Sequence, residues 1–151
     1  VELPGGTPAE KADFRDNLIA DIANIEQGMR IALIGVVNPL IAAIRKRGGT
    51  CLPCDLQMER TQWGDPVEKD MEKVLDSADG VICTGMTLSN GTFDRVVERV
   101  LERNIPLTVY AQTGSAVAAR FVGNGITSLL AESFPFSQFS ANATRVFCYK
   151  G

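Results

Sequence analysis

Short continuous apolar runs recur along the chain and are bounded by Gly, Pro, Asn and Asp. Runs of this length are typical of strands that are buried on both faces of a parallel sheet. We predict strands at residues 29–35, 50–56, 80–84, 106–111, 126–131 and 144–150. Pro53 lies inside the second run, and because proline cannot donate a ladder hydrogen bond, it indicates a sheet edge, a bulge or an early strand end.

Segments with helical spacing of apolar residues separate these runs. Thr7 and Pro8 are typical of a helix start, and we expect the helix that follows to bury one stripe, made of Phe14, Leu18, Ile22 and Ile25. Further helices are predicted to begin at Asn38-Pro39, at Asp65-Pro66 and at about Thr92, with a short one at 116–122.

Strands that alternate with helices at this spacing form right-handed βαβ units. The pattern therefore predicts an α/β fold, a Rossmann-like three-layer sandwich with a mostly parallel sheet and helices on both faces. We assign residues 1–28 to an N-terminal helix and connector and residues 29–151 to the Rossmann-like domain, in a single domain overall.

Composition narrows the classes of function. The chain has 151 residues, 45% of them hydrophobic, and a net charge of -3, which is typical of a globular protein and argues against nucleic-acid binding. No apolar run approaches the ~20 residues of a membrane span. Four cysteines without the density of a disulfide scaffold favour a reduced, cytoplasmic location. The absence of histidine removes the commonest general base and metal ligand.

Three loops that follow predicted strands share Gly and small hydroxyl or amide residues, and each leads into a helix. In such folds ligands bind beyond the carboxyl ends of the strands, where free N–H groups at helix N-termini form an anion site. The candidate ligand-binding residues are Gly35, Asn38, Pro39, Asp55, Thr84, Gly85, Thr87, Leu88, Asn90, Gly91, Thr92, Thr113, Gly114 and Ser115.

Alternatives remain for this set. The loop at 85–92 can simply turn the chain and cap the next helix through Asn90 or Thr92, and Asp55 can be either a ribose-binding acid or a solvated strand end. Neither a three-glycine dinucleotide fingerprint nor a phosphate-loop lysine is present, so an ordinary NAD or ATP site is disfavoured.

Cys51 and Cys54 have the spacing of a metal knuckle or redox pair, and Cys83 directly precedes the Thr84 loop. Thiolates favour a soft ion such as Zn or Cu. Residues three apart in a strand point to opposite faces, so Cys51 and Cys54 converge only if Pro53 breaks the strand. The alternative is buried structural thiols, and Cys148 is expected in the core.

The segments "IALIGVVNPLIAAIRKRG" and "ADGVICTGMTLSNGTFDRVV" resemble an uncharacterised prokaryotic family described as "putative heavy-metal chelation". Its motif, Thr-Gly-x-Thr-Leu-x-Asn-Gly-Thr, matches residues 84–92 without a gap, and the resemblance extends from about Met29 to Leu130. It implies a Rossmann-like domain, usually carried behind an N-terminal domain that resembles the cap of enolases. The loop at 112–115 departs from the family's Gly-Pro-Ser.

We therefore predict a domain that binds a small molecule or metal complex through backbone amides and Thr/Asn side chains at the carboxyl edge of the sheet. The cofactor stays open, with Zn, Cu or a metal complex as candidates. One alternative is an enzyme or enzyme subunit that uses Cys54, Cys83 or Asp55. Another is an interaction domain, completed by a second copy or by a partner chain that supplies the N-terminal domain, with an apolar patch of Phe134, Phe136 and Phe139.

Overall fold

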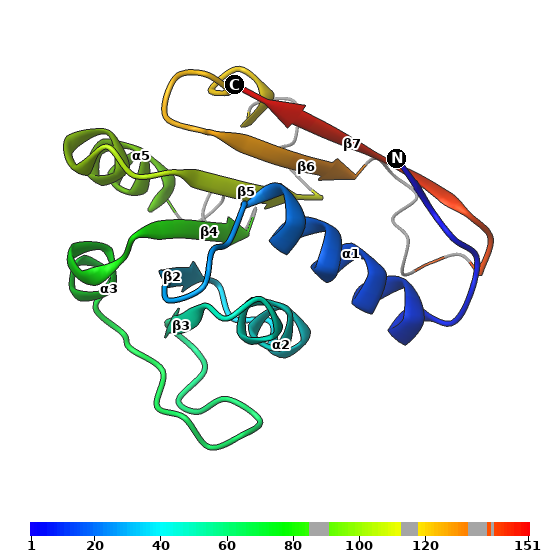
Figure 1. The fold of residues 1–151 in the computed structure, drawn as a ribbon, viewed down its shortest axis with the longest axis horizontal. Helices are drawn as coiled ribbons and strands as arrows, with labels where there is room; N and C mark the ends of the chain where they lie inside the picture. Colours follow the sequence, from blue (N-terminus) through cyan, green and yellow to red (C-terminus); the bar gives the residue numbers. More distant parts are fainter. Residues whose placement is uncertain (85–90, 113–117, 133–138, 140) are drawn as a thin grey trace.

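A computed structural model describes residues 1–84, 91–112, 118–132, 139 and 141–151 (Figure 1). The strands are β1 (Glu2–Leu3), β2 (Arg30–Ile34), β3 (Thr50–Cys54), β4 (Gly80–Thr84), β5 (Leu107–Ala111), β6 (Ser128–Glu132) and β7 (Thr144–Lys150). The helices are α1 (Pro8–Ile22), α2 (Asn38–Lys46), α3 (Met71–Ser77) and α5 (Phe93–Arg103). None of the helices in these ranges is long and apolar enough to cross a membrane.

The strands form a single sheet in the order β1-β7-β6-β5-β4-β2-β3. β2 to β6 are all parallel, which confirms the predicted α/β architecture. β7 runs antiparallel to β6, and β1 pairs antiparallel with β7, so the N-terminal segment contributes an edge strand that the sequence pattern did not predict.

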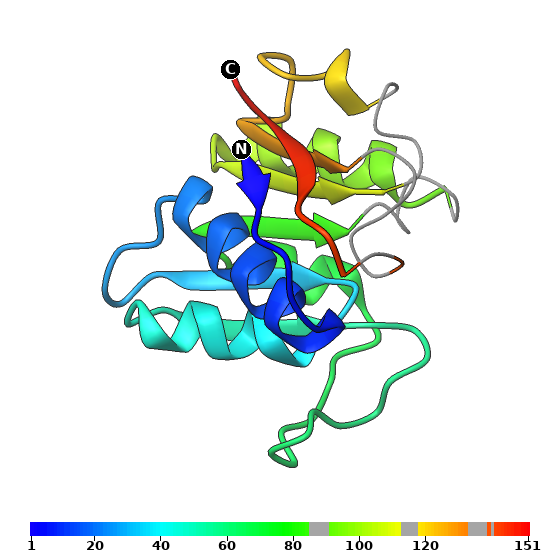
Figure 2. The same cartoon turned by 90° about the vertical axis from the view of Figure 1, so that its right-hand side faces the viewer.

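Helices cover both faces of the sheet, as predicted. One core cluster packs α1 and α2 against the sheet, and the other packs α3 and α5 against the opposite face. Figure 2 shows α1 and α2 in front of the sheet and α5 behind it. The parallel strands point in one direction, so their carboxyl ends share one edge of the sheet.

The β3 edge explains two features of the sequence. Pro53 lies in β3, at the edge of the sheet, which is one of the three positions that its missing N–H permits. The predicted helix start at Asp65-Pro66 is wrong, because the chain there runs along this edge: the Glu68 N–H donates to the Pro53 carbonyl at 2.9 Å. α3 begins only at Met71, where the Asp70 side chain caps it.

The buried face of α1 differs from the predicted apolar stripe. Ile22 is buried, but Phe14 is 42% exposed, and the fully buried positions include Lys11 and Asp16. A helix that turns charged residues toward the sheet must satisfy them through tertiary partners. These partners lie at the carboxyl edge of the sheet.

Candidate functional site

The direction of the crossovers reverses between β2 and β4. β2 is followed by β3 on one side, whereas β4, β5 and β6 succeed one another on the other side. In open parallel sheets this reversal separates the loops and opens the crevice in which ligands bind.

Gly35 and Thr84 lie side by side at this crevice, since Ile34 pairs with Cys83 one residue earlier. Gly35 has φ +84, and a Cβ built on it would clash with Thr84 Oγ1. Only glycine allows both this backbone conformation and this close approach. The two residues therefore bring main chain and hydroxyl together at the carboxyl edge of the sheet, where the crossovers reverse.

Two helix N-termini face the same edge of the sheet. α2 and α5 follow the two strands at the crevice, and in both the side chain at the cap position makes no capping hydrogen bond. α2 begins at Asn38, as predicted, with Val37 at the cap position, and Asn38 Oδ1 accepts from the Gln62 N–H at 3.1 Å. Thr92 occupies the cap position of α5, but its side chain does not cap the helix. Both helices therefore begin at the carboxyl edge of the sheet, where their dipoles have the positive end.

Asp55, placed at the carboxyl end of β3, fixes the loops around the crevice. One carboxylate oxygen accepts the Val36 N–H at 3.0 Å, and the other accepts those of Gln57 and Met58 at 2.8 and 3.3 Å. Partial burial alone would raise the pKa of Asp55, but these backbone donors lower it below its ordinary value. The carboxylate is thus ionised and already occupied by the protein's own amides.

A group of polar side chains lies at the ends of β5 and β6, on the face covered by α1. Glu132 is 1% exposed and accepts from Tyr110 Oη at 2.7 Å and from Gln112 Nε2 at 3.1 Å. Thr84 pairs with Tyr110 across β4 and β5, so their side chains point to the same face. This group therefore adjoins the Gly35–Thr84 crevice on the α1 side.

α1 supplies charged residues to the same group. Arg15 Nε donates to Asp16 Oδ1 at 3.0 Å, and its guanidinium lies 5.0 Å from the centre of the Tyr110 ring. Lys11 Nζ donates to the Asn142 carbonyl at 2.5 Å. We call Lys11, Arg15, Asp16, Tyr110, Gln112 and Glu132 the α1 polar cluster.

Burial shapes the acid–base properties of this cluster. Burial raises the pKa of Asp16 despite the neighbouring Arg15. Burial and the nearby Glu132 raise the pKa of Tyr110, so its hydroxyl stays protonated and donates. The pKa of Arg15 is raised as well, because the attraction of Asp16 and Tyr110 outweighs the opposing effect of burial.

The remaining candidate residues fall into two groups. Gly91, with φ +76, and Thr92 lead into α5, and Pro39 lies in the first turn of α2. The others lie outside the described residues, namely Gly85, Thr87, Leu88, Asn90, Thr113, Gly114 and Ser115.

The cysteines do not gather around one point. Cys51 packs against the α1–α2 face, whereas Cys54 and Cys83 belong to the opposite core and are separated by β2. Adjacent strands lie about 4.8 Å apart, so roughly 10 Å separates those two. Within the described ranges no three Cys, Asp or Glu side chains could share a metal ion.

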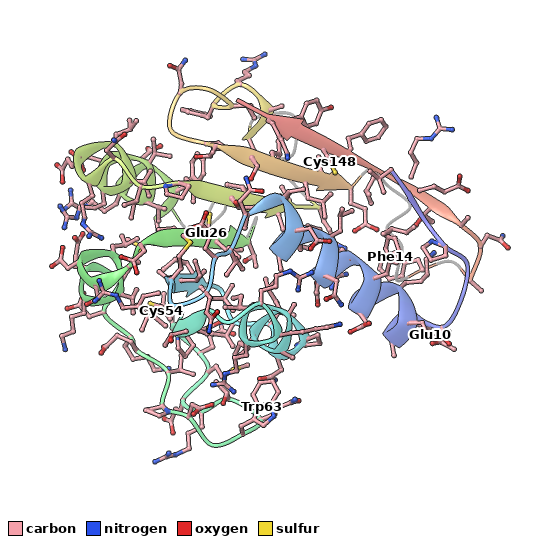
Figure 3. All side chains as sticks on the ribbon, in the orientation of Figure 1. Glu10, Phe14, Glu26, Cys54, Trp63 and Cys148 are labelled. Carbon is pink, nitrogen blue, oxygen red and sulfur yellow. The ribbon has the colours of Figure 1, made fainter. Side chains whose placement is uncertain are left out.

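The environment of the thiols is unfavourable for nucleophilic chemistry. Burial raises the pKa of Cys51 to about 12 and that of Cys54 to about 11, so neither forms a thiolate at neutral pH. The expectation that Cys148 is in the core is wrong: it is exposed on β7, far from Cys54 at the other side of the sheet (Figure 3). Only Val146 of that strand is buried.

Sequence reasoning missed the α1 polar cluster entirely. The available signals were Lys11 and Asp16 within an amphipathic helix, and Tyr110 and Gln112 at alternate positions of one strand. Each of these residues is common at such a position and indicates no site by itself. Their significance depends on contacts between segments more than a hundred residues apart, such as that between Lys11 and Asn142.

Solved structures share this fold. A protein of unknown function from the DUF364 family of Pyrococcus horikoshii is 17% identical, with a TM-score of 0.64 over 82% of this chain and 54% of that one. LysN, an α-aminoadipate aminotransferase from Thermus thermophilus, is 13% identical, with a TM-score of 0.60 over 93% and 39%. The Escherichia coli methionine aminotransferase YbdL is 11% identical, with a TM-score of 0.60 over 96% and 40%.

The chain thus spans about half the length of the first of these proteins and less of the others, and at these identities the likeness concerns the fold alone. A search of curated proteins found no match. The family model described as "Putative heavy-metal chelation" matches residues 18–129, which is most of the chain. The chain therefore belongs to the DUF364 family.

Proposed function

We propose that this chain is a ligand-binding domain that holds a small organic molecule, free or as a metal complex, over Gly35 and Thr84. The observation that carries the proposal is the close approach of these two residues where the crossovers reverse. A glycine with positive φ lets the main chain and a neighbouring hydroxyl approach closely at the edge of the sheet where ligands bind in such folds.

The surroundings support the same proposal. The N-termini of α2 and α5 contribute the positive ends of two helix dipoles at this edge of the sheet. Asp55 and Asn38 hold the neighbouring loops through backbone amides, which fixes the shape of the crevice before a ligand arrives. Preorganisation of this kind reduces the entropy cost of binding.

The family description points to a metal, and the thiols bear on how one would be held. Cys51, Cys54 and Cys83 are divided between two faces of the sheet and do not fit a shared heavy-metal site. The donors around the crevice are amides and hydroxyls, which suit an organic molecule. A metal would accordingly arrive already chelated by that molecule.

The test combines native mass spectrometry of the freshly purified chain with thermal melting against nucleotides, pterins, siderophore-like chelators, free metal ions and amino acids. A ligand at about a hundredfold over its Kd adds ~2.7 kcal/mol of stability and raises the melting temperature. Hydrogen exchange should then show protection at residues 35–41 and 91–96. The opposite edge, at residues 105–108, serves as the internal control.

A matched pair of variants locates the site. Thr84→Val removes the hydroxyl, whereas Thr84→Ser keeps it, so affinity should fall about 3- to 10-fold for the valine variant only. A flat response to every compound, or protection confined to another part of the chain, would refute the proposal.

A further inference from the structure

Asp16 is a buried acceptor with an unused oxygen. Its side chain is 2% exposed, Oδ1 accepts from Arg15, and no donor in the described ranges reaches Oδ2. A buried carboxylate oxygen left without a donor is unfavourable, so native proteins rarely contain one without a functional or solvent partner. Asp16 is linked to Tyr110 by Arg15, which donates to Asp16 Oδ1 and lies over the Tyr110 ring, so it belongs to the α1 polar cluster.

Arg15 supplies the complementary group. Its side chain is 11% exposed, and its only hydrogen bond in the described part of the chain is made by Nε. Both Nη groups therefore keep their N–H donors, while stacking on Tyr110 fixes the guanidinium plane. A fixed guanidinium fork with free donors matches a carboxylate.

The formal charges of the cluster set the charge of what it can accept. Lys11 and Arg15 are formally cationic, and Asp16 and Glu132 are formally anionic, so the cluster is neutral overall. A bare anion would be repelled by the two carboxylates, and a bare cation by Lys11 and Arg15. A neutral molecule that carries both charges close together satisfies both unused groups at once.

We propose that the α1 polar cluster recognises a free α-amino acid, with the ammonium group at Asp16 Oδ2 and the carboxylate at the Nη groups of Arg15. Arg15 and Asp16 are adjacent and bonded to each other, so the two charges of their ligand must also lie close together. In an α-amino acid a single carbon separates the ammonium from the carboxylate. The inference rests on the proposed function, since it names the ligand class for the α1 side of the same crevice.

Thermal melting with individual L-amino acids tests this, followed by isothermal titration of those that stabilise the chain. At least one should raise the melting temperature by several degrees at about 10 mM. Its N-acetyl derivative and its amide should not, because each lacks one of the two charges. A dipeptide separates free amino acids from peptide ends and should not bind either.

Asp16→Asn is the decisive variant, and Asp13→Asn is its matched control on the same helix. Asn keeps the size of the side chain but loses the charge, so the Kd should rise about 10- to 100-fold, whereas the exposed Asp13→Asn variant should stay within about twofold. Arg15→Lys, which loses the fork but keeps the charge, should also weaken binding. Melting without ligand verifies that each variant is folded.

The outcomes separate this inference from the proposed function. If amino acids fail but another compound binds and responds to Thr84→Val, the amino-acid inference is overturned and the binding domain stands. If blocked derivatives bind as well as the free amino acid, or if Asp16→Asn leaves the Kd unchanged, the inference is also overturned. If nothing binds, both fail.

Discussion

Gly35→Ala tests the packing at the floor of the crevice. The residue has φ +84, and a left-handed conformation costs a non-glycine residue about 1 to 2 kcal/mol. The new Cβ would also clash with Thr84 Oγ1, and overpacking of a tight site costs about 1 to 3 kcal/mol more. The variant should therefore lose roughly 2 to 5 kcal/mol of unfolding free energy, measured by urea denaturation.

Two comparisons separate these contributions. Gly64 has nearly the same φ, +86, with nothing within 4 Å of a built Cβ, so Gly64→Ala should show the conformational cost alone. Adding Thr84→Ala to Gly35→Ala removes the contacting hydroxyl and should recover about 1 to 3 kcal/mol as coupling in a double-mutant cycle. The reasoning is refuted if Gly35→Ala costs no more than Gly64→Ala, or if the cycle shows no coupling.

The remaining predictions concern charge, thiols and a helix cap. Burial raises the pKa of Asp16 in the folded state above its ordinary value of 3.8, so ionisation of Asp16 destabilises the fold as the pH rises from 3.8 through the raised pKa. Asp16→Asn should therefore raise the melting temperature at pH 7 but not below about pH 3.8. Alkylation followed by mass spectrometry should add one group to the folded chain, at Cys148, and four after unfolding; a second fast site would contradict the burial of Cys51, Cys54 and Cys83. Thr7→Ala should lower the free energy of unfolding by about 1 kcal/mol, since it removes the capping box with Glu10, and Thr7→Ser should keep most of it.

The strands other than β1 were predictable because their apolar runs are a local property of the sequence. A parallel strand buried on both faces needs a continuous apolar run, and the run at 80–84 coincides with β4. The run at 144–150 coincides with β7, although that strand is antiparallel and mostly exposed. The direction of β7 was not predictable, because the same residues fit a parallel or an antiparallel neighbour. The chain between β3 and α3 was misread for a related reason: Asp65-Pro66 is a good helix start locally, but pairing with the edge of β3 outweighs it.

The crevice itself was predicted in part. Gly35 and Thr84 were identified because glycine and threonine follow apolar runs, but their adjacency depends on strand order, which local spacing does not reveal. Asp55 and Asn38 were predicted to contact a ligand, yet their hydrogen bonds go to neighbouring backbone. Polar residues at the ends of strands can either bind a ligand or hold neighbouring loops, and only their contacts in the structure distinguish these two roles.

The position of α1 links the N-terminal segment to the crevice. α1 runs antiparallel to the strands, so its last residue meets the amino end of β6, where Ser128 Oγ donates to the Ile22 carbonyl, and its first half lies at the carboxyl edge. An ordinary covering helix would present only apolar residues there. α1 instead presents Arg15 and Asp16, which meet Tyr110 at the end of β5, next to Thr84. Apolar residues at these positions would often be at least as stable in a helix that only covers the sheet, so the ion pair of Arg15 with the buried Asp16 and its unused oxygen supports the proposed role in binding.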